Sequence, residues 1–354
     1  MVRLMFCAWI TSKRSRIPWE RITFANFPNR IDRAAFRALL MASVIVVSFL
    51  SAPHTGFSTQ LENPQLAHNS GDDERALRLL RKLAEQGDAS AQSDLGIMYA
   101  EGKGVVRDFK QAIKWFRLAA LRENANAQFN LALMYEHGNG VPQDFEEAIK
   151  WFQLAAKRGL AEAQFNLGVV YEAAIGVPQD FEQALSWYRL AAIQGHTDAQ
   201  NNLAGLYRSG RGVSQDYLEA IKWYRSAAEQ GNANAQTNLG AMYCDGQGVD
   251  PDFKECAKWY RLAAEQGKAS AQLLLGALYV EGNGVARDYI QAHVWWSVAA
   301  ARGEASARKG RDELSEILTK EQVDEAQAIA KKCLNSNYKQ CEGSNSQKVI
   351  KTAH

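Results

Sequence analysis

Four asparagines recur at one fixed interval in the middle of the chain, and their side chains have the chemistry to bind a peptide backbone. Asn130, Asn166, Asn202 and Asn238 are each 36 residues apart. A side-chain amide both donates and accepts hydrogen bonds, so it can pair with the N–H and C=O groups of an extended segment. The same amides could instead bond to the neighbouring structural unit. The spacing alone leaves both interpretations open.

The residue immediately before this asparagine position varies along the chain. A binding surface would show such variation, and so would a neutral exposed position. We expect Phe129 and Phe165 to be exposed aromatic anchors for a partner, since buried aromatic side chains dominate many interfaces. The position holds Ser93, Phe129, Phe165, Asn201, Thr237 and Leu273.

Other chemistry lacks a recognisable constellation of residues. The chain contains no G-x-S-x-G, H-E-x-x-H, Walker A or G-x-G-x-x-G motif, and no Cys–His cluster has zinc-ligand spacing. Ser306 and Ser336 each begin an S-x-x-K sequence, but neither S-D-N nor K-T-G accompanies them. The sequence therefore predicts a protein that is not an enzyme, with no cofactor, no metal site and no small-molecule substrate.

The elements that carry the asparagines are internal repeats with a period of 36 residues. A period in this range predicts a solenoid, in which each unit buries its apolar face against its neighbours. Four residue types keep this register over six units: Trp115, Trp151, Trp187, Trp223, Trp259 and Trp295; Gln92, Gln128, Gln164, Gln200, Gln236 and Gln272; Tyr99, Tyr135, Tyr171, Tyr207, Tyr243 and Tyr279; and Val105, Val141, Val177, Val213, Val249 and Val285.

One unit, residues 88–123, predicts a pair of helices. Gly102 can adopt a positive φ and end the first helix. Asp108 is suited to the start of the second helix, where its carboxylate can accept unpaired amide hydrogens. Ala119 and Ala120 begin a series of Ala–Ala pairs, and the recurring tryptophans are expected to pack in the core beside such small residues.

The N-terminal part of the chain differs in charge from the rest. Eight basic residues stand against two acidic ones in residues 1–37, which leaves residues 38–354 near −4 and without a basic stripe for nucleic acid. The basic stretch precedes a 13-residue apolar run, Ala38 to Leu50. Residues 38–58 are therefore predicted to be a signal peptide, cleaved after Ala52 or Ser58, or an uncleaved signal anchor. Residues 59–71 read as a linker.

The repeats resemble a known family. The pattern A-x-x-x-L-G-x-x-Y-x-x-G-x-G-V-x-x-D-x-x-x-A-x-x-W-[FY]-x-x-A-A is similar to the Sel1-like repeat, a relative of the tetratricopeptide repeat. Six copies occupy residues 88–303 and a half-copy occupies 72–87. The resemblance implies an all-α, right-handed superhelix of antiparallel helix pairs whose first helices line a concave face. It also implies capping helices over 304–334, the second starting near Thr319, and a tail over 335–354.

The resemblance bears on the asparagines and on the cysteines. In tetratricopeptide domains the position five residues before the tyrosine holds peptide-binding asparagines, and Asn130, Asn166, Asn202 and Asn238 occupy it here. Exported relatives resemble the pattern KKCLNSNYKQCEG, which implies a disulfide between Cys333 and Cys341. Cys244 and Cys256 either pair or serve as small core residues.

Two residues depart from the pattern. Ala174 replaces the glycine that ends a first helix, which predicts a less relaxed turn there, and Glu123 replaces the glycine that follows a second helix. His293, at an aliphatic position, is expected to be a partly buried structural residue.

Together these features predict a protein–protein interaction scaffold in a bacterial cell envelope, periplasmic or secreted. The expected partner is an extended protein segment on the concave face, which is centred on Phe129, Asn130, Phe165, Asn166, Asn202 and Asn238. No nucleic acid is expected, and a membrane only through an N-terminal anchor. Two other classes stay open: a β-lactam-binding or β-lactam-hydrolysing enzyme, and a module that binds glycan or peptidoglycan.

Overall fold

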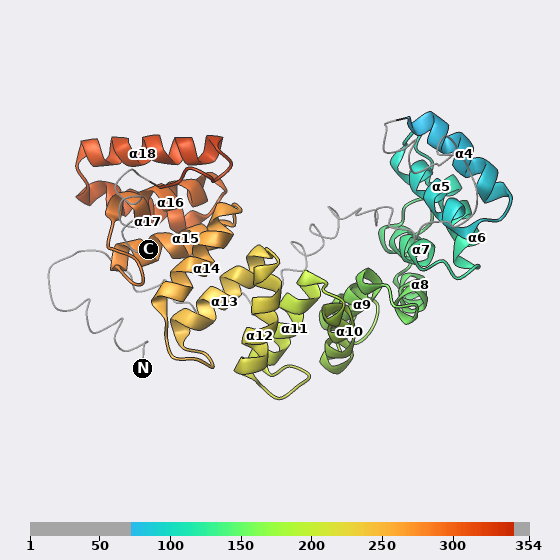
Figure 1. The fold of residues 1–354 in the computed structure, drawn as a ribbon, viewed down its shortest axis with the longest axis horizontal. Coiled ribbons are helices and arrows are strands. Elements are labelled where there is room, and N and C mark those ends of the chain that lie inside the picture. The colour runs from blue at the N-terminus through green and yellow to red at the C-terminus, as the bar shows by residue number, and fades with distance from the viewer. Residues whose placement is uncertain (1–71, 343–354) are drawn as a thin grey trace. The chain divides into compact units, whose positions relative to one another are not determined.

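The computed structural model describes residues 72–342, and every regular element in that range is an α-helix (Figure 1). The helices fall into two compact units, one ending at His196 and the other beginning at Thr197. The basic extension, the predicted signal segment and the linker lie outside the described residues. Among residues 72–342, no helix combines the length and the apolar character that crossing a membrane requires.

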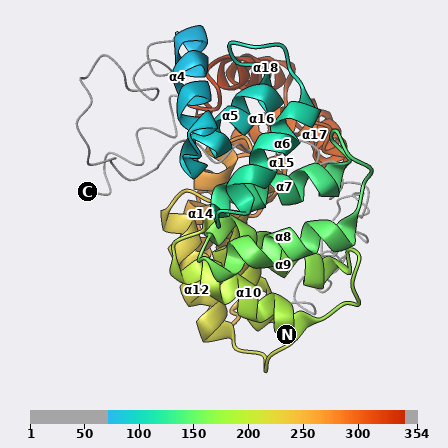
Figure 2. The ribbon, with the colours of Figure 1, turned by 90° about the vertical axis from the view of Figure 1, so that its right-hand side faces the viewer.

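The first unit consists of one unpaired helix followed by three helix pairs (Figure 2). Its helices are α4 (Asp73–Glu85), α5 (Ala89–Glu101), α6 (Phe109–Ala120), α7 (Ala125–His137), α8 (Phe145–Lys157), α9 (Ala161–Ala173) and α10 (Phe181–Ile193).

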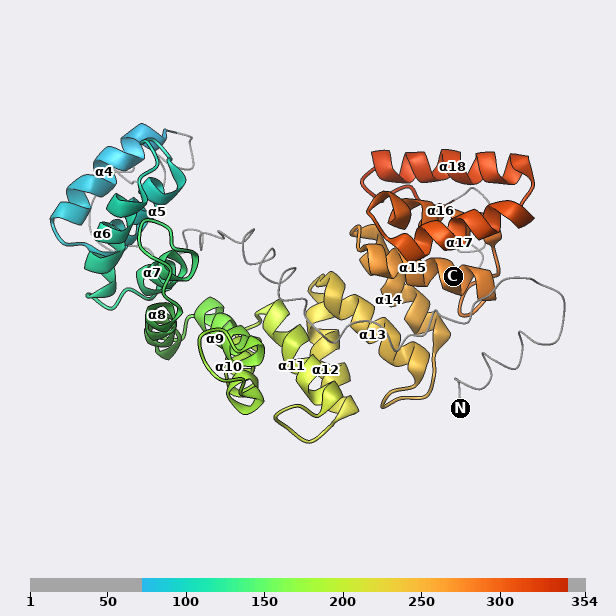
Figure 3. The same cartoon turned by 180° about the vertical axis from the view of Figure 1, so that it is seen from behind.

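The second unit consists of three helix pairs followed by two further helices that pack on the last pair (Figure 3). Its helices are α11 (Thr197–Ser209), α12 (Tyr217–Glu229), α13 (Ala233–Asp245), α14 (Phe253–Glu265), α15 (Ala269–Glu281), α16 (Tyr289–Ala301), α17 (Ala305–Ile317) and α18 (Lys320–Asn335).

The helix ends follow the predicted capping residues. Asp108 caps α6 by accepting the amide hydrogens of Lys110 and Gln111, and the aspartates 36 residues apart cap α8, α10, α12, α14 and α16 in the same way. Gly102 ends α5 in the left-handed conformation, with φ 75°. Both predictions are confirmed. Ala174 takes the same conformation at φ 57° and Glu123 at φ 64°, where a β-carbon crowds the backbone.

Within a pair, small residues on the first helix receive an aromatic ring from the second helix. A Cβ on Gly96 would lie 2.6 Å from the ring of Phe116, and a Cβ on Gly240 would lie 2.7 Å from the ring of Tyr260. These contacts confirm the expected packing of large against small residues, and they fix how closely the two helices approach. The tryptophans pack as expected too: Trp151 contacts the core formed by α5, α6 and α7, so it joins one pair to the preceding one.

Adjacent pairs are also joined by the recurring glutamines. In five of them, Nε2 donates to a backbone carbonyl in the last turn of the preceding second helix, at 3.0–3.1 Å. Such carbonyls have no partner within their own helix, so a buried side-chain amide is a fitting donor. The five donors are Gln92, Gln128, Gln164, Gln236 and Gln272.

The last pair is covered by α17 and α18. Thr319 and Gln322 form a reciprocal capping box at the start of α18, which confirms the expected helix start near Thr319. Two disulfides lie in this unit. Cys244 is bonded to Cys256 with Cα atoms 5.4 Å apart, and Cys333 is bonded to Cys341 with Cα atoms 4.4 Å apart.

Candidate functional site

In the first unit, the two asparagines of the repeated position differ in what they bond. The Asn166 Nδ2 donates to the carbonyl of Glu162, one turn earlier in α9, at 2.8 Å. Asn130, in α7, is 5% exposed, and its Nδ2 is buried with no hydrogen-bond acceptor among the described residues. An unpaired buried donor typically costs about 1–3 kcal/mol. The Asn130 amide is therefore unsatisfied within this unit, and an acceptor from outside reaches it only if neighbouring side chains move.

In the second unit, the equivalent asparagines form a network between repeats. The Asn238 Nδ2 donates to Asn201 Oδ1 at 3.0 Å, which joins α13 to α11. The Asn201 Nδ2 in turn donates to Asn202 Oδ1 at 3.1 Å. Of the two interpretations that the spacing left open, the structure shows the structural one here: the amide of Asn238 bonds to the neighbouring repeat. Asn238 therefore has a structural role, and Asn201 takes part in it although it stands one residue before the repeated position.

The two phenylalanines do not form a pair of exposed anchors. Phe129 is 4% exposed, and its ring centroid lies 5.6 Å from that of Phe152 in the core between α7 and α8. The expectation for Phe129 was wrong because this face of α7 packs on its own partner helix. Phe165 is half-buried; its ring stacks on His196 at 4.6 Å and contacts Tyr188 at 5.9 Å. Only Phe165 keeps an accessible edge.

In the first full repeat, the position of these asparagines holds an aspartate, Asp94. Burial, with a smaller contribution from the Asp88 carboxylate, raises the pKa of Asp94 to about 7. A protonated carboxyl both donates and accepts, as an amide does. Near neutral pH, Asp94 thus offers the same pair of functions as Asn130 and Asn166. The last repeat has Leu274 at this position and offers neither.

Comparison with known proteins places the repeats in a family. The Sel1 repeat matches seven consecutive stretches, residues 70–88, 89–124, 125–160, 161–196, 197–232, 233–268 and 269–304. The chain belongs to the Sel1 repeat family. The first stretch, which contains α4, is the half-copy that precedes the six full repeats.

Two solved Sel1-type structures are similar to this Sel1 repeat protein. A Sel1 repeat protein from Oxalobacter formigenes is 35% identical, with a TM-score of 0.63; the match covers 68% of this chain and 99% of that one. A protective antigen of uropathogenic Escherichia coli with an SLR fold is 29% identical, with a TM-score of 0.45; the match covers 79% of this chain and 78% of that one. No curated protein is a significant match. Sel1 repeats are in general non-catalytic scaffolds that bind other proteins, and the repeats of this chain form a protein-interaction scaffold.

Two buried polar groups that the repeat pattern did not reveal lie in α5 and α7. Ser93 Oγ in α5 and Glu136 Oε2 in α7 are buried and accept or donate no hydrogen bond within the described chain. Burial raises the pKa of Glu136 to about 7. Comparing the repeats column by column would have shown Glu136 as a charged residue at a position that holds Ala100 one repeat earlier.

The residues considered for other chemistry have structural contacts. The Ser336 hydroxyl donates to the Cys333 carbonyl at 3.0 Å, and Lys309, three residues after Ser306, pairs with Glu313 at 3.9 Å. Across residues 72–342, no group of three or more His, Cys, Asp or Glu side chains is arranged to hold a metal ion. His293 is 1% exposed and bonds to Ser297 and Ser315, so it is more deeply buried than expected.

Proposed function

We propose that this Sel1 repeat protein binds an extended segment of a partner protein through the first-helix position occupied by Asp94, Asn130 and Asn166. The observation that carries the proposal is the buried amide of Asn130, which lacks an acceptor among residues 72–342. A backbone carbonyl of the partner would supply that acceptor once the side chains that cover the Asn130 amide move aside. Asp94 and Asn166 stand one repeat to either side. Near neutral pH Asp94 offers both a donor and an acceptor, whereas Asn166 offers its amide oxygen, because its Nδ2 donates to the Glu162 carbonyl.

In the second unit, Asn202 is the corresponding candidate. Its Oδ1 accepts from Asn201, but its Nδ2 takes no part in that network. Asn238 is left out of the binding role because its amide already joins two repeats. Phe129 is left out because it is a core residue. Phe165, half-buried beside Asn166, can add apolar contact area to a bound segment.

We further propose that the protein acts outside the cytoplasm, in the cell envelope. The basic stretch followed by the apolar run Ala38 to Leu50 supports export. The two disulfides support it as well, because disulfides persist in oxidising compartments. Intact-mass measurement on fractionated cells tests this proposal. A protein that starts near residues 53–59 outside the cytoplasm agrees with it, and a cytoplasmic protein that retains Arg37 contradicts it.

The binding proposal is tested with one double variant and one matched control. A partner is first captured from envelope extract with the full repeat domain, and its affinity is then measured for Asn130→Ala/Asn166→Ala and for Asn238→Ala. Two lost amide contacts of about 1 kcal/mol each should weaken binding by about tenfold or more. The melting temperature of the double variant should fall only slightly, because Asn130 loses no internal hydrogen bond and Asn166 loses only its bond to the Glu162 carbonyl within its own helix.

The control variant has the opposite expectation. Asn238→Ala removes the bond to Asn201, so its melting temperature should fall while its affinity for the first unit's ligand stays near that of the parent. A double variant that melts much earlier and binds normally would assign Asn130 and Asn166 to structure and would contradict the proposal.

A further inference from the structure

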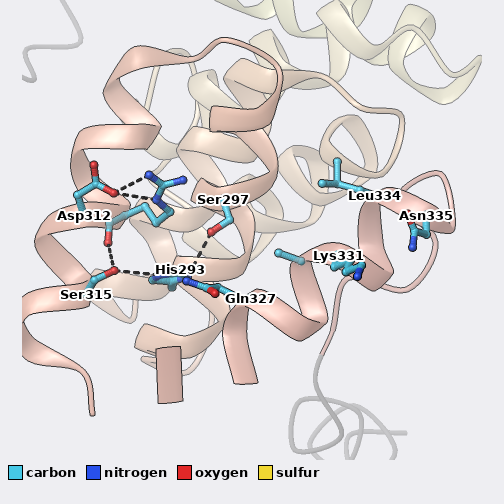
Figure 4. Close-up of a pocket in the computed structure, with 10 residues that line it drawn as sticks. His293, Ser297, Asp312, Ser315, Gln327, Lys331, Leu334 and Asn335 are labelled. Atoms are coloured by element: carbon cyan, nitrogen blue, oxygen red, sulfur yellow. Dashed lines mark hydrogen bonds and ion pairs between the residues drawn. The ribbon is translucent and has the colours of Figure 1, made fainter. Parts of the chain in front are cut away.

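A polar hollow lies in the second unit where α16, α17 and α18 meet, away from the asparagine positions (Figure 4). Its volume is about 470 Å³, within the range of small-molecule sites. Figure 4 shows His293, Ser297 and Gln327 in the middle of the hollow, with Asp312 and Ser315 on one side and Lys331 and Asn335 on the other. The hydrogen-bond directions inside the hollow and the charges at its rim determine which ligand groups it can accept.

The hydrogen bonds of His293 define which polar atoms face the hollow. The Ser315 hydroxyl donates to the Arg311 carbonyl at 2.9 Å, so its oxygen accepts from His293 Nε2 at 3.1 Å. Burial, assisted by the Arg311 charge, lowers the pKa of His293, so the ring is neutral. Its Nδ1 is then an acceptor, and the Ser297 hydroxyl donates to it at 3.3 Å.

Ser297 therefore presents acceptor lone pairs to the hollow. A hydroxyl has one hydrogen to donate, and that hydrogen is committed to His293. A ligand group that contacts the Ser297 oxygen must be a donor, such as an amide N–H or an ammonium group.

The rim of the hollow carries an excess of positive charge. Arg311 is held by Asp312, to which its Nε donates at 2.9 Å and its Nη2 at 2.6 Å. Lys331 has no ion-pair partner within residues 72–342, and the amides of Gln327 and Asn335 make no hydrogen bond there. The lining thus favours one negative charge together with groups that accept hydrogen bonds.

We propose that this hollow binds the C-terminal end of a peptide, with the terminal carboxylate at Lys331 and a backbone N–H at the oxygen of Ser297. A peptide C-terminus combines a carboxylate with an amide N–H within one residue, which matches the cation and the acceptor that the hollow provides. The carboxylate and the preceding carbonyl also accept from Gln327 and Asn335. The site uses none of the asparagines of the first-helix position. A test of this site is therefore independent of a test of the function proposed above.

The test compares two probes on the full chain by calorimetric titration: N-acetyl-trialanine with a free carboxylate, and the same peptide with a C-terminal carboxamide. The free acid is expected to bind at least about tenfold more tightly, since hydrogen bonds to a charged group are about twice as strong as neutral ones. Equal affinities for the two probes, or no binding of the acid, would overturn the proposal.

Two variants and one control locate the site. Lys331→Gln removes the exposed cation and should reduce the affinity for the acid to near that of the carboxamide. Ser297→Ala should weaken both probes, because it removes the acceptor for the N–H. Lys320→Gln makes the same charge change in the first turn of α18, outside the hollow, and should leave the affinity unchanged. If Lys320→Gln weakens binding as much as Lys331→Gln does, the effect is one of general charge and the site is wrong.

Discussion

The hydroxyl of Tyr188 donates a hydrogen bond to the carboxylate of Glu172, 2.7 Å away, inside the helix pair α9–α10. One repeat earlier, the same two positions hold Phe152 and Glu136. Phe152 has no hydroxyl, and the Glu136 Oε2 is buried without a hydrogen bond, with His137 Nδ1 3.8 Å from it. A missing phenolic oxygen in α8 thus leaves a buried carboxyl oxygen in α7 without a hydrogen-bond donor.

Phe152→Tyr should therefore stabilise the protein. The new hydroxyl would reach Glu136 as Tyr188 reaches Glu172, and a hydrogen bond to a charged or buried partner contributes about 1–3 kcal/mol. Phe116→Tyr is the matched control, since the position that faces it one repeat earlier holds Ala100, which accepts nothing. That control should be destabilising. Urea unfolding of both variants measures the difference, and a Phe152→Tyr midpoint below that of the parent would contradict the prediction.

The titration of Glu136 should make stability fall as pH rises. Burial raises the pKa of this group from 4.5 to about 7, so between these values the folded chain holds a proton that the unfolded chain has released. Stability is then lost from pH 4.5 upwards, and the loss is complete above pH 7, up to about 3 kcal/mol. Glu136→Gln, which cannot ionise, should flatten this slope and raise the urea midpoint at pH 8.

Asp94 titrates in the same range, because its pKa is also raised to about 7. The slope of Glu136→Gln should therefore be reduced and not abolished, and Asp94→Asn/Glu136→Gln should be flatter still. A parent protein whose urea midpoint does not change between pH 4.5 and 8 would show that neither carboxyl is desolvated in solution.

The fold could be predicted from the sequence because one local rule recurs at every repeat. The second helices begin at aspartates such as Asp108, and the first helices end at glycines such as Gly102, so both helix boundaries depend on residues that act within one turn. The 36-residue register then fixes which helices are neighbours. Contacts between neighbouring helices were therefore enough to predict the fold.

The candidate site could be predicted only in part, because its polar groups depend on contacts between repeats. Asn130 and Asn238 are identical in type and position, yet one amide is unpaired and the other bonds to Asn201. That difference follows from the residue type 37 positions earlier. The Asn238 amide meets the acceptor side chain of Asn201, whereas the residue 37 positions before Asn130 is Ser93, whose short side chain makes no hydrogen bond to it. The burial of Phe129 was missed for a related reason, since a first helix in a solenoid packs on several neighbours and not on one face alone.

The recurring glutamines should differ in how much they contribute to the free energy of unfolding, because their side-chain oxygens have different partners. Gln164 donates to the Ala156 carbonyl at 3.1 Å and accepts from Gln194 at 2.7 Å. Gln128 makes the same donation to Ala120 at 3.1 Å, but its Oε1 is buried with no donor in the described chain. Gln164→Ala should therefore destabilise the chain by about 1 kcal/mol more than Gln128→Ala.

Both glutamine variants remove the side-chain donor from one carbonyl of the preceding helix, which keeps its backbone bond from Gly159 or Glu123, so that loss cancels in the comparison. Thermal and urea unfolding of the two alanine variants provide the measurement. Equal losses would show that the Gln194 side chain contributes nothing beyond its contact in the static structure.

The disulfide between Cys333 and Cys341 should hold residues 336–342 against the last two helix pairs. Three contacts depend on this placement: Gln291 Nε2 donates to the Cys341 carbonyl at 2.5 Å, Arg302 Nη1 donates to Tyr338 Oη at 2.7 Å, and Arg261 pairs with Glu342 at 3.2 Å. Cys341→Ser removes the link and leaves the backbone carbonyl in place. In the chain-entropy description, opening so short a loop lowers stability by about 2–3 kcal/mol.

Hydrogen exchange distinguishes this role from a general effect on stability. In Cys341→Ser, the amides of residues 336–342 should exchange faster at a urea concentration where α16 is still protected, because the segment can leave its contacts locally. The control is Cys244→Ser/Cys256→Ser, whose bond joins the end of α13 to the first turn of α14. It should lower the urea midpoint by a similar amount and leave exchange at 336–342 unchanged. If Cys341→Ser shows no faster exchange in that segment, Gln291, Arg302 and Arg261 hold it without the disulfide.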